Sequence, residues 1–202
     1  MGKHNWKNLP LVSAGLVIVN CLVFLVCQLT GDRLTTLGML SPWSVFVDGE
    51  VWRVFTAMFL HGDVQHIFSN MLILFFLGSM LEKEIGHLPL FIIYLLSGIG
   101  GNAASLYEKY ARGSLVASLG ASGAVFGLDG LLLALVLFSP KRWETAPVPR
   151  VIAMILLSLY SGYTAEHIDN AAHVGGLITG FLAGIVWCQV FEKRRRRKNL
   201  EY

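Results

Sequence analysis

The sequence centres on Gly120-Ala121-Ser122-Gly123-Ala124-Val125-Phe126-Gly127, in which one serine lies among small residues, and the apolar run 131–138 follows it. Small residues allow another helix or a substrate backbone to approach closely, because no branched side chain keeps it away. We expect Ser122 in the first turn of a helix, beside unpaired backbone N–H groups and the positive end of the helix dipole. Taken alone, the stretch is more typical of a packed membrane-helix interface than of a catalytic site.

The composition indicates a polytopic membrane protein. The chain has 202 residues, of which 54% are hydrophobic and 14% are charged, whereas ordinary globular domains carry about 25% charged residues. The first apolar run is long and lacks a small-residue cleavage site, so we expect no cleavable signal peptide. Cys21, Cys27 and Cys188 all lie in apolar runs without metal-ligand spacing, and we expect them to pack as small hydrophobic residues.

The predicted fold class is all-α, with six transmembrane helices, because a span needs about 20 mostly apolar residues. We expect segment 30–65 to form an outer loop of short amphipathic helices in the membrane interface, where Trp43, Trp52 and Phe55 are favoured. Glu82-Lys83-Glu84 is expected to end the second span, and a polar connection, 107–118, to lead towards Ser122. The predicted spans are 10–29, 66–81, 88–106, 122–138, 148–163 and 172–191.

The distribution of basic residues predicts that both termini face the cytoplasm, since Lys and Arg are enriched in cytoplasmic loops. The expected domains are a cytoplasmic segment 1–9, a membrane domain 10–192 and a basic cytoplasmic tail 193–202. The tail could indicate nucleic-acid binding, but directly after a span it is more typical of an anchor facing anionic lipid. The cytoplasmic set is Lys3, Lys7, Lys83, Lys141, Arg142, Arg150 and all of 193–198; the outer set is Arg33, Arg53, Lys109 and Arg112.

A serine nucleophile needs an adjacent base, and His173 is the strongest candidate among the histidines of the outer side. It begins a helix and is followed by Gly176 and Gly180, which with Gly127 would let the fourth and sixth spans pack closely. Such packing would bring an imidazole within hydrogen-bonding distance of Ser122. The alternative is a helix-end histidine bonded to a backbone carbonyl, and the residues alone favour neither.

His66 and Asn70 are four residues apart and share a helix face, from which both could donate to an oxyanion. The alternative is an interhelical polar clamp, which is commoner for such a pair. Asp129 lies about two turns below Ser122, too far to orient His173, and is expected to bind a hydroxyl or backbone group or to be protonated. Asp169 could orient the imidazole, although a loop residue is the simpler interpretation.

Three groups of residues, taken together, resemble the rhomboid family of intramembrane serine proteases. They are Gly120-Ala121-Ser122-Gly123, His173-Val174-Gly175-Gly176 with Gly180, and His61 followed by His66-Ile67-Phe68-Ser69-Asn70. The pair Trp52-Arg53 is similar to the family's first-loop signature. The resemblance runs from the first outer loop to the last span and fits the family's six-helix core.

The resemblance implies a role for each matching position. Ser122 would be the nucleophile, His173 the general base, and His66, Asn70 and the Ser122 N–H the oxyanion hole. Phe126 would stack on the catalytic imidazole. Gly123, Gly127, Gly176 and Gly180 would pack the two helices, and the dyad would need no third acid. Asp129 has no place in the family pattern.

The predicted function is hydrolysis of peptide bonds in or near transmembrane segments by a Ser-His dyad, with no cofactor and no metal. The resemblance implies single-span membrane proteins as substrates, with the fifth span, near Ser161-Gly162, as a lateral gate. The expected location is a bacterial plasma membrane, with the site open to the outer side. We expect the lipid bilayer, but no nucleic acid, as a further partner; the sequence leaves the oligomeric state undetermined.

Other classes of function fit less well. The sequence has no His-Glu-x-x-His zinc motif, and no second intramembrane aspartate that could pair with Asp129. A catalytically inactive binder of transmembrane segments would have no need to retain both Ser122 and His173. A small transporter is disfavoured because internal repeats are not evident.

Overall fold

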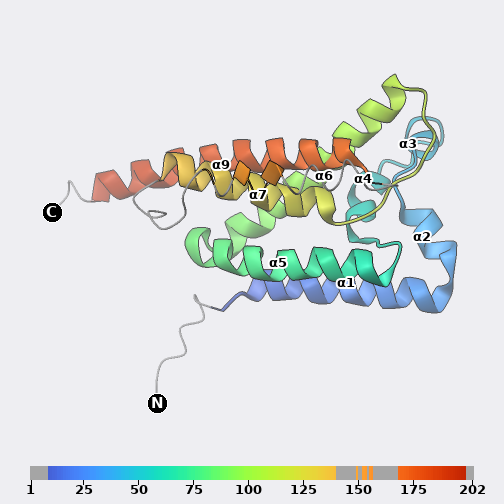
Figure 1. Ribbon diagram of the computed structural model, residues 1–202, viewed down its shortest axis with the longest axis horizontal. Coiled ribbons are helices and arrows are strands. Elements are labelled where there is room, and N and C mark those ends of the chain that lie inside the picture. The colour runs from blue at the N-terminus through green and yellow to red at the C-terminus, as the bar shows by residue number, and fades with distance from the viewer. Residues whose placement is uncertain (1–8, 140–148, 150–151, 154, 157–167, 199–202) are drawn as a thin grey trace, which may run out of the picture.

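The long helices α1 (Leu11–Thr30), α5 (Val64–Ile85), α7 (Ser122–Phe138) and α9 (Asn170–Lys198) run along a common direction, and α6 (His87–Ala111) lies obliquely to them (Figure 1). The computed structural model describes residues 9–139, 149, 152–153, 155–156 and 168–198, and within these the only β pairing is an isolated bridge between Leu40 and Ser118. Among the described residues, four helices include stretches long and apolar enough to cross a membrane, and a fifth is apolar but shorter. They are α1, α5, α6 and α9, with α7 as the shorter one.

The predicted fifth span, 148–163, and the gate at Ser161-Gly162 lie largely or wholly outside the described residues. The first and fourth predicted spans agree with α1 and α7 to within one residue. The last span begins two residues earlier than expected, and its helix continues without a break past 192 to Lys198. Arginine and lysine are good helix formers, so a basic tail can extend the helix that precedes it.

Two helices extend beyond the predicted ends of their spans. Helix α5 ends at Ile85, one residue after Glu82-Lys83-Glu84 and four residues after the predicted span 66–81, and the Glu82 carboxylate turns inwards and accepts hydrogen bonds from α1. Its oxygens lie 2.7 Å from the Val12 N, 2.8 Å from the Ser13 N and 2.6 Å from the Ser13 Oγ. The polar connection also begins later than expected, since α6 continues through Tyr107 to Ala111. In both helices a polar residue near the predicted end, Glu82 in α5 and Lys109 in α6, bonds to another part of the fold, and the helix continues past it.

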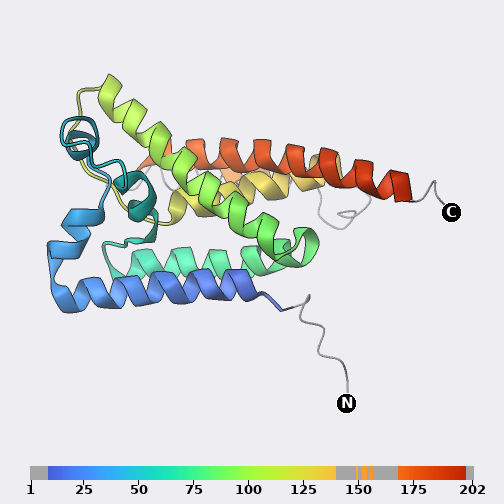
Figure 2. The ribbon, with the colours of Figure 1, turned by 180° about the vertical axis from the view of Figure 1, so that it is seen from behind.

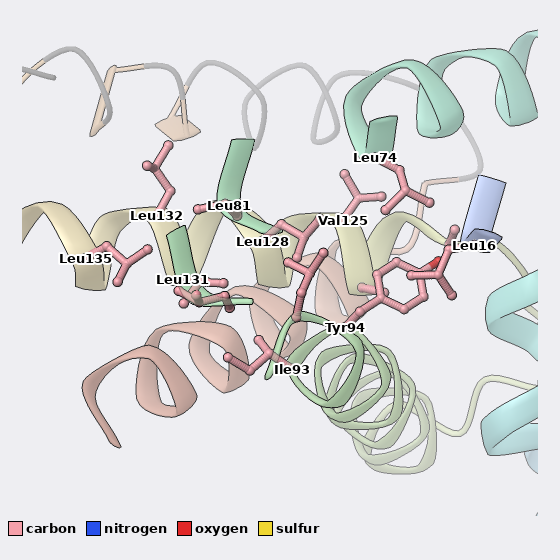
Figure 3. Close-up of a cluster of buried hydrophobic side chains, with 14 of the residues drawn as sticks. Leu16, Leu74, Leu81, Ile93, Tyr94, Val125, Leu128, Leu131, Leu132 and Leu135 are labelled. Carbon is pink, nitrogen blue, oxygen red and sulfur yellow. The ribbon is translucent and has the colours of Figure 1, made fainter. Parts of the chain in front are cut away.

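The helices form two pairs that α6 connects. Figures 1 and 2 show α1 beside α5, α7 beside α9, and α6 crossing between the pairs. Figure 3 shows the core between them, where Leu128 and Leu131 of α7 face side chains of α5 and α6. Leu74, Leu81, Leu90, Tyr94, Leu128 and Leu131 are completely or almost completely buried.

The first loop is ordered, as predicted, and consists of short helices at one end of the bundle (Figure 1). Arg53 holds this loop together: it is buried, donates to the Thr36 and Met39 carbonyls at 2.7 and 2.9 Å, and pairs with Glu50. Trp43, Trp52 and Phe55 are exposed, as side chains in a membrane interface would be. The short helices are α2 (Asp32–Gly38), α3 (Pro42–Phe46), α4 (Arg53–Thr56) and the 3-10 turn η2 (Ala57–Phe59).

Helices α7 and α9 pack in parallel with their backbones in contact. A Cβ at Gly176 would collide with the Gly123 carbonyl, and a Cβ at Gly180 with the Gly127 carbonyl, one turn further along both helices. Such approach is available only to glycine, since any other residue would place a side chain between the two backbones. The contact fixes the register of α9 against α7.

The glycine contact leads to a stability prediction. We expect Gly180→Ala to lower the free energy of unfolding by at least about 1–3 kcal/mol, since the new methyl group overpacks a rigid backbone contact. Gly15→Ala in α1 is the matched control, because a Cβ there would meet nothing within 4 Å. Thermal unfolding in mild detergent measures both variants. Equal unfolding midpoints would contradict the close-contact interpretation.

Candidate active site

Ser122 and His173 lie within hydrogen-bonding distance, although 51 residues separate them in the chain. Ser122 is the first residue of α7, and its Oγ is 2.9 Å from the Nε2 of His173 in the first turn of α9. His173 is buried. If Nε2 is to accept the serine proton, the neutral imidazole must carry its own proton on Nδ1. A buried, neutral imidazole facing a serine hydroxyl has the geometry of a base for a nucleophile.

Phe126 lies one turn after Ser122 and stacks on the His173 ring, with centroids 4.2 Å apart and an angle of 20° between the planes. Stacking restricts rotation of the imidazole about its side-chain bonds. The aromatic ring therefore helps to keep Nε2 directed at the serine.

His66 approaches the serine from α5, with Gly120 between them. Gly120 has φ +136°, and a Cβ on it would lie 2.9 Å from the His66 Nε2 and 3.7 Å from the Ser122 Oγ. A side chain at this position would therefore fill the space that these two groups share. Asp63 is the N-cap of α5: its carboxylate accepts a hydrogen bond from the His66 N at 2.8 Å and so fixes the start of the helix.

Asn70 is buried one turn after His66 on α5. Its Nδ2 donates to the His66 carbonyl at 2.9 Å, so one of its two amide protons already has an acceptor. The second proton would be the one to bind an oxyanion. Asn70 is thus connected to His66 through the backbone of the same helix.

His61, which the sequence marked only as part of a motif, is buried next to His66, with ring centroids 5.1 Å apart. Burial, followed by the charge of His66, lowers the pKa of His61 to about 4, against smaller opposite effects of Phe59 and Asp63. His61 is therefore neutral at pH 7 and adds no positive charge beside His66.

The structure separates the alternatives that the sequence left open for the two aspartates. Asp129 is buried in α7, and its carboxyl makes no hydrogen bond to the part of the chain that the structure describes, which favours the expected protonated form over a bonded partner. Asp169 is more than a loop residue. Its Oδ1 accepts from the Ala172 N at 3.0 Å, and its Oδ2 is 2.8 Å from the Nζ of Lys109.

Sequence reasoning missed Lys109 and Ser105, both buried on α6. The signal was their spacing: Asn102, Ser105 and Lys109 follow one another at three and four residues and therefore share one helix face. Among the described residues, no three His, Cys, Asp or Glu side chains come close enough to hold a metal ion.

Comparisons with known proteins agree with the resemblance seen in the motifs. A family model described as a rhomboid domain matches residues 48–190. RHOMBOID-like protein 1 of Arabidopsis thaliana is 38% identical over 156 residues, or 76% of this chain and 39% of the relative. Rhomboid protease GluP of Bacillus subtilis is 33% identical over 83% of this chain and 33% of its own length. Rhomboid protease AarA of Providencia stuartii is 32% identical over 76% of this chain and 62% of its own length. The chain thus spans less than two thirds of each relative.

The buried His61 predicts a pH-dependent stability. Its pKa is lowered from 6.5 to about 4, so between these values the unfolded chain binds more protons than the folded one, and stability falls as the pH falls. The loss for this group amounts to about 3 kcal/mol. We expect His61→Gln to reduce the fall of the unfolding midpoint between pH 6.5 and 4. Parallel curves for the variant and the wild type would contradict this assignment.

Proposed function

Because the chain belongs to the rhomboid family, whose members in the comparison include bacterial rhomboid proteases, we propose that it is an intramembrane serine endopeptidase. The observation that carries the proposal is the 2.9 Å contact between the Ser122 Oγ and the His173 Nε2. The two residues come from different helices, and the backbone contact of α7 with α9 brings them together. In the proposed reaction Ser122 is the nucleophile and His173 the general base.

The protein is an integral membrane protein, as its apolar helices and its family indicate. We propose six spans with both termini in the cytoplasm. Helices α7 and α9 are parallel, so the end of α7 and the start of α9 lie at opposite ends of the bundle (Figure 1). The proposed fifth span, 148–163, would connect these two ends. Within this scheme 1–9, 10–192 and 193–202 remain the proposed domains.

In the proposed mechanism His173 takes the proton of Ser122 as the serine oxygen attacks the scissile carbonyl. The imidazolium then gives this proton to the leaving amine, which leaves an acyl-enzyme. A water molecule, activated by His173, hydrolyses the ester and regenerates the serine. The stacking of Phe126 on His173 supports this assignment, because the ring must keep one orientation through both steps.

The negative charge of the tetrahedral intermediate needs hydrogen-bond donors close to Ser122. We propose the Ser122 N–H, at the start of α7 where backbone N–H groups are unpaired, together with His66 and Asn70. Support comes from Gly120, whose absent side chain leaves room between His66 and Ser122. Glycine at this position is therefore part of the proposed oxyanion hole.

The proposed substrates are single-span membrane proteins that can unwind near the cleaved bond, since a helical backbone does not expose its carbonyl to a nucleophile. The proposed location is a bacterial plasma membrane, with the site open to the outer side. The second candidate is an inactive binder of transmembrane segments. The Ser122–His173 contact favours the protease, because binding alone does not require a serine paired with a histidine.

The dyad predicts the behaviour of two variants. Ser122→Ala and His173→Ala should each lower the cleavage of a reporter transmembrane substrate by at least about 10⁴-fold, because loss of either member disables the nucleophile. A fluorophosphonate should label Ser122 in the wild type and fail to do so in His173→Ala. Cleavage is followed by gel electrophoresis of purified protein in detergent or liposomes.

The matched control is Ser114→Ala, which removes a hydroxyl from the connection between α6 and α7, where it accepts a hydrogen bond from the Val116 N. It should cleave at the wild-type rate. Undiminished cleavage by either dyad variant would refute the mechanism. Substrate binding without cleavage or labelling by the wild type would favour the inactive binder.

We expect the loss of Asn70 to reduce activity less than the loss of Ser122 or His173. Asn70→Ala should lower kcat by about 10²–10³-fold, as expected for loss of one oxyanion donor, with the fold retained. KM should change little, because the donor acts on charge that develops after binding. Steady-state kinetics with the reporter substrate give both constants, and the unfolding midpoint reports the fold. Full activity would remove Asn70 from the proposed oxyanion hole.

A further inference from the structure

A buried polar cluster lies at the outer end of the bundle, where α6 ends and α9 begins. Its centre is the ion pair between the Lys109 Nζ and the Asp169 Oδ2, which are 2.8 Å apart. Lys109 is only 7% exposed and Ser105 is completely buried. The Ser105 Oγ donates to the same carboxylate oxygen at 2.5 Å. A lysine at such burial needs a specific partner, because an unpaired charge there is strongly unfavourable.

Asp169 connects this cluster to the helix that carries His173. Its Oδ1 accepts from the Ala172 N at 3.0 Å, and its backbone carbonyl accepts from the His173 N at 3.2 Å. Burial raises the pKa of Asp169, but the hydrogen bonds from Lys109 and Ser105, the Lys109 charge and the Ala172 N–H outweigh it and keep the pKa below its usual value. The carboxylate is therefore charged and holds the first turn of α9.

Lys109 connects the same cluster to the segment that leads to the nucleophile. Its Nζ also donates to the Ser118 Oγ at 2.7 Å. Ser118 is fixed in turn by two backbone hydrogen bonds with Leu40, of 2.8 and 2.9 Å. Ser118 precedes Ser122 by four residues, just as Asp169 precedes His173 by four. One ammonium group thus joins the two segments that deliver the two proposed catalytic side chains.

We propose that Lys109 and Asp169 are positioning residues, which set the separation of Ser122 and His173 through the starts of α7 and α9. The inference rests on the proposed function. It differs from a catalytic triad, because the Asp169 oxygens are used by Lys109, Ser105 and the Ala172 N. The Nδ1 of His173 has no hydrogen-bond partner among the residues that the structure describes. Asp169 therefore acts on the helix and leaves the imidazole itself free of a carboxylate.

Glycine contacts alone fix the register of α7 against α9 but not the path of the segments before the two helices. The polar cluster fixes these two segments, since Lys109 bonds both to Ser118, just before α7, and to Asp169, just before α9. Buried ion pairs contribute little net stability when they replace apolar contacts, and their best-supported use is to specify one arrangement. Positioning is the role that this chemistry fits.

The test compares Lys109→Met, Lys109→Arg and Arg112→Met. Lys109→Met should lower kcat and the rate of fluorophosphonate labelling by about ten- to a hundred-fold with KM nearly unchanged, because a displacement of about 1 Å between reacting groups costs that much. Lys109→Arg keeps a charged donor and should restore most of the activity. Arg112→Met is the control: it breaks an exposed ion pair with Glu108 at the same helix end and should change neither constant.

Nitrogen NMR of histidine-labelled protein gives a readout that needs no activity. Loss of the hydrogen bond in Ser122→Ala identifies the His173 signal, and Lys109→Met should move this signal in the same direction. An unchanged signal together with an unchanged kcat would overturn the positioning role. A fall in kcat that only follows a fall in Tm, and that is restored at a lower assay temperature, would also overturn it.

Failure of the two proposals can be told apart. A wild-type protein that neither cleaves nor is labelled would refute the proposed function. The His173 signal would then still show whether Lys109 controls the contact with Ser122. An active wild type with a fully active Lys109→Met variant would refute the positioning role and leave the proposed function intact.

Discussion

The backbone contact between α7 and α9 is the constraint on which the rest of the structure depends. Gly176 and Gly180 lie against the carbonyls of Gly123 and Gly127, so the two helices can neither slide nor rotate without a collision. This register places the first residue of α7 opposite the first turn of α9, where Ser122 meets His173. The same register brings Phe126 under the imidazole. Hydrophobic burial stabilises the bundle as a whole, but it would permit many registers.

Much of the fold could be predicted because its signals are local: long apolar runs led to α1, α7 and α9, and glycines at helical spacing indicated that α7 and α9 pack closely. The pairing of Ser122 with His173 needed the resemblance to the rhomboid family, since the residues alone left a helix-end histidine equally open. The contact between Lys109 and Asp169 was not predicted, because the two residues are 60 positions apart in the chain and neither belongs to the motifs on which the resemblance rests. Tyr107 and Tyr110, which flank Lys109 and are exposed, also made the last turn of α6 resemble the polar connection predicted for 107–118.

Glu82 illustrates the same limit within a membrane helix. A run of charged residues after an apolar stretch normally marks the end of a span, and Lys83 and Glu84 fit that rule. Glu82 breaks it because the N–H groups of Val12 and Ser13, at the start of α1, need acceptors. Its carboxylate supplies them and also approaches His87 at 2.5 Å. Where an ionisable group satisfies the end of a neighbouring helix, hydropathy alone misplaces the boundary.

The order of the helices along the chain has a consequence for biosynthesis. Ser122 is made and inserted before His173, and 51 residues of chain separate them. A nascent chain that has inserted α7 but not α9 carries the serine without its imidazole, and without the glycine contacts that would align the two. In the proposed mechanism this hydroxyl has no base until α9 enters the membrane and packs against α7. On the proposed function, protease activity would therefore appear only after α9 has been inserted and packed against α7.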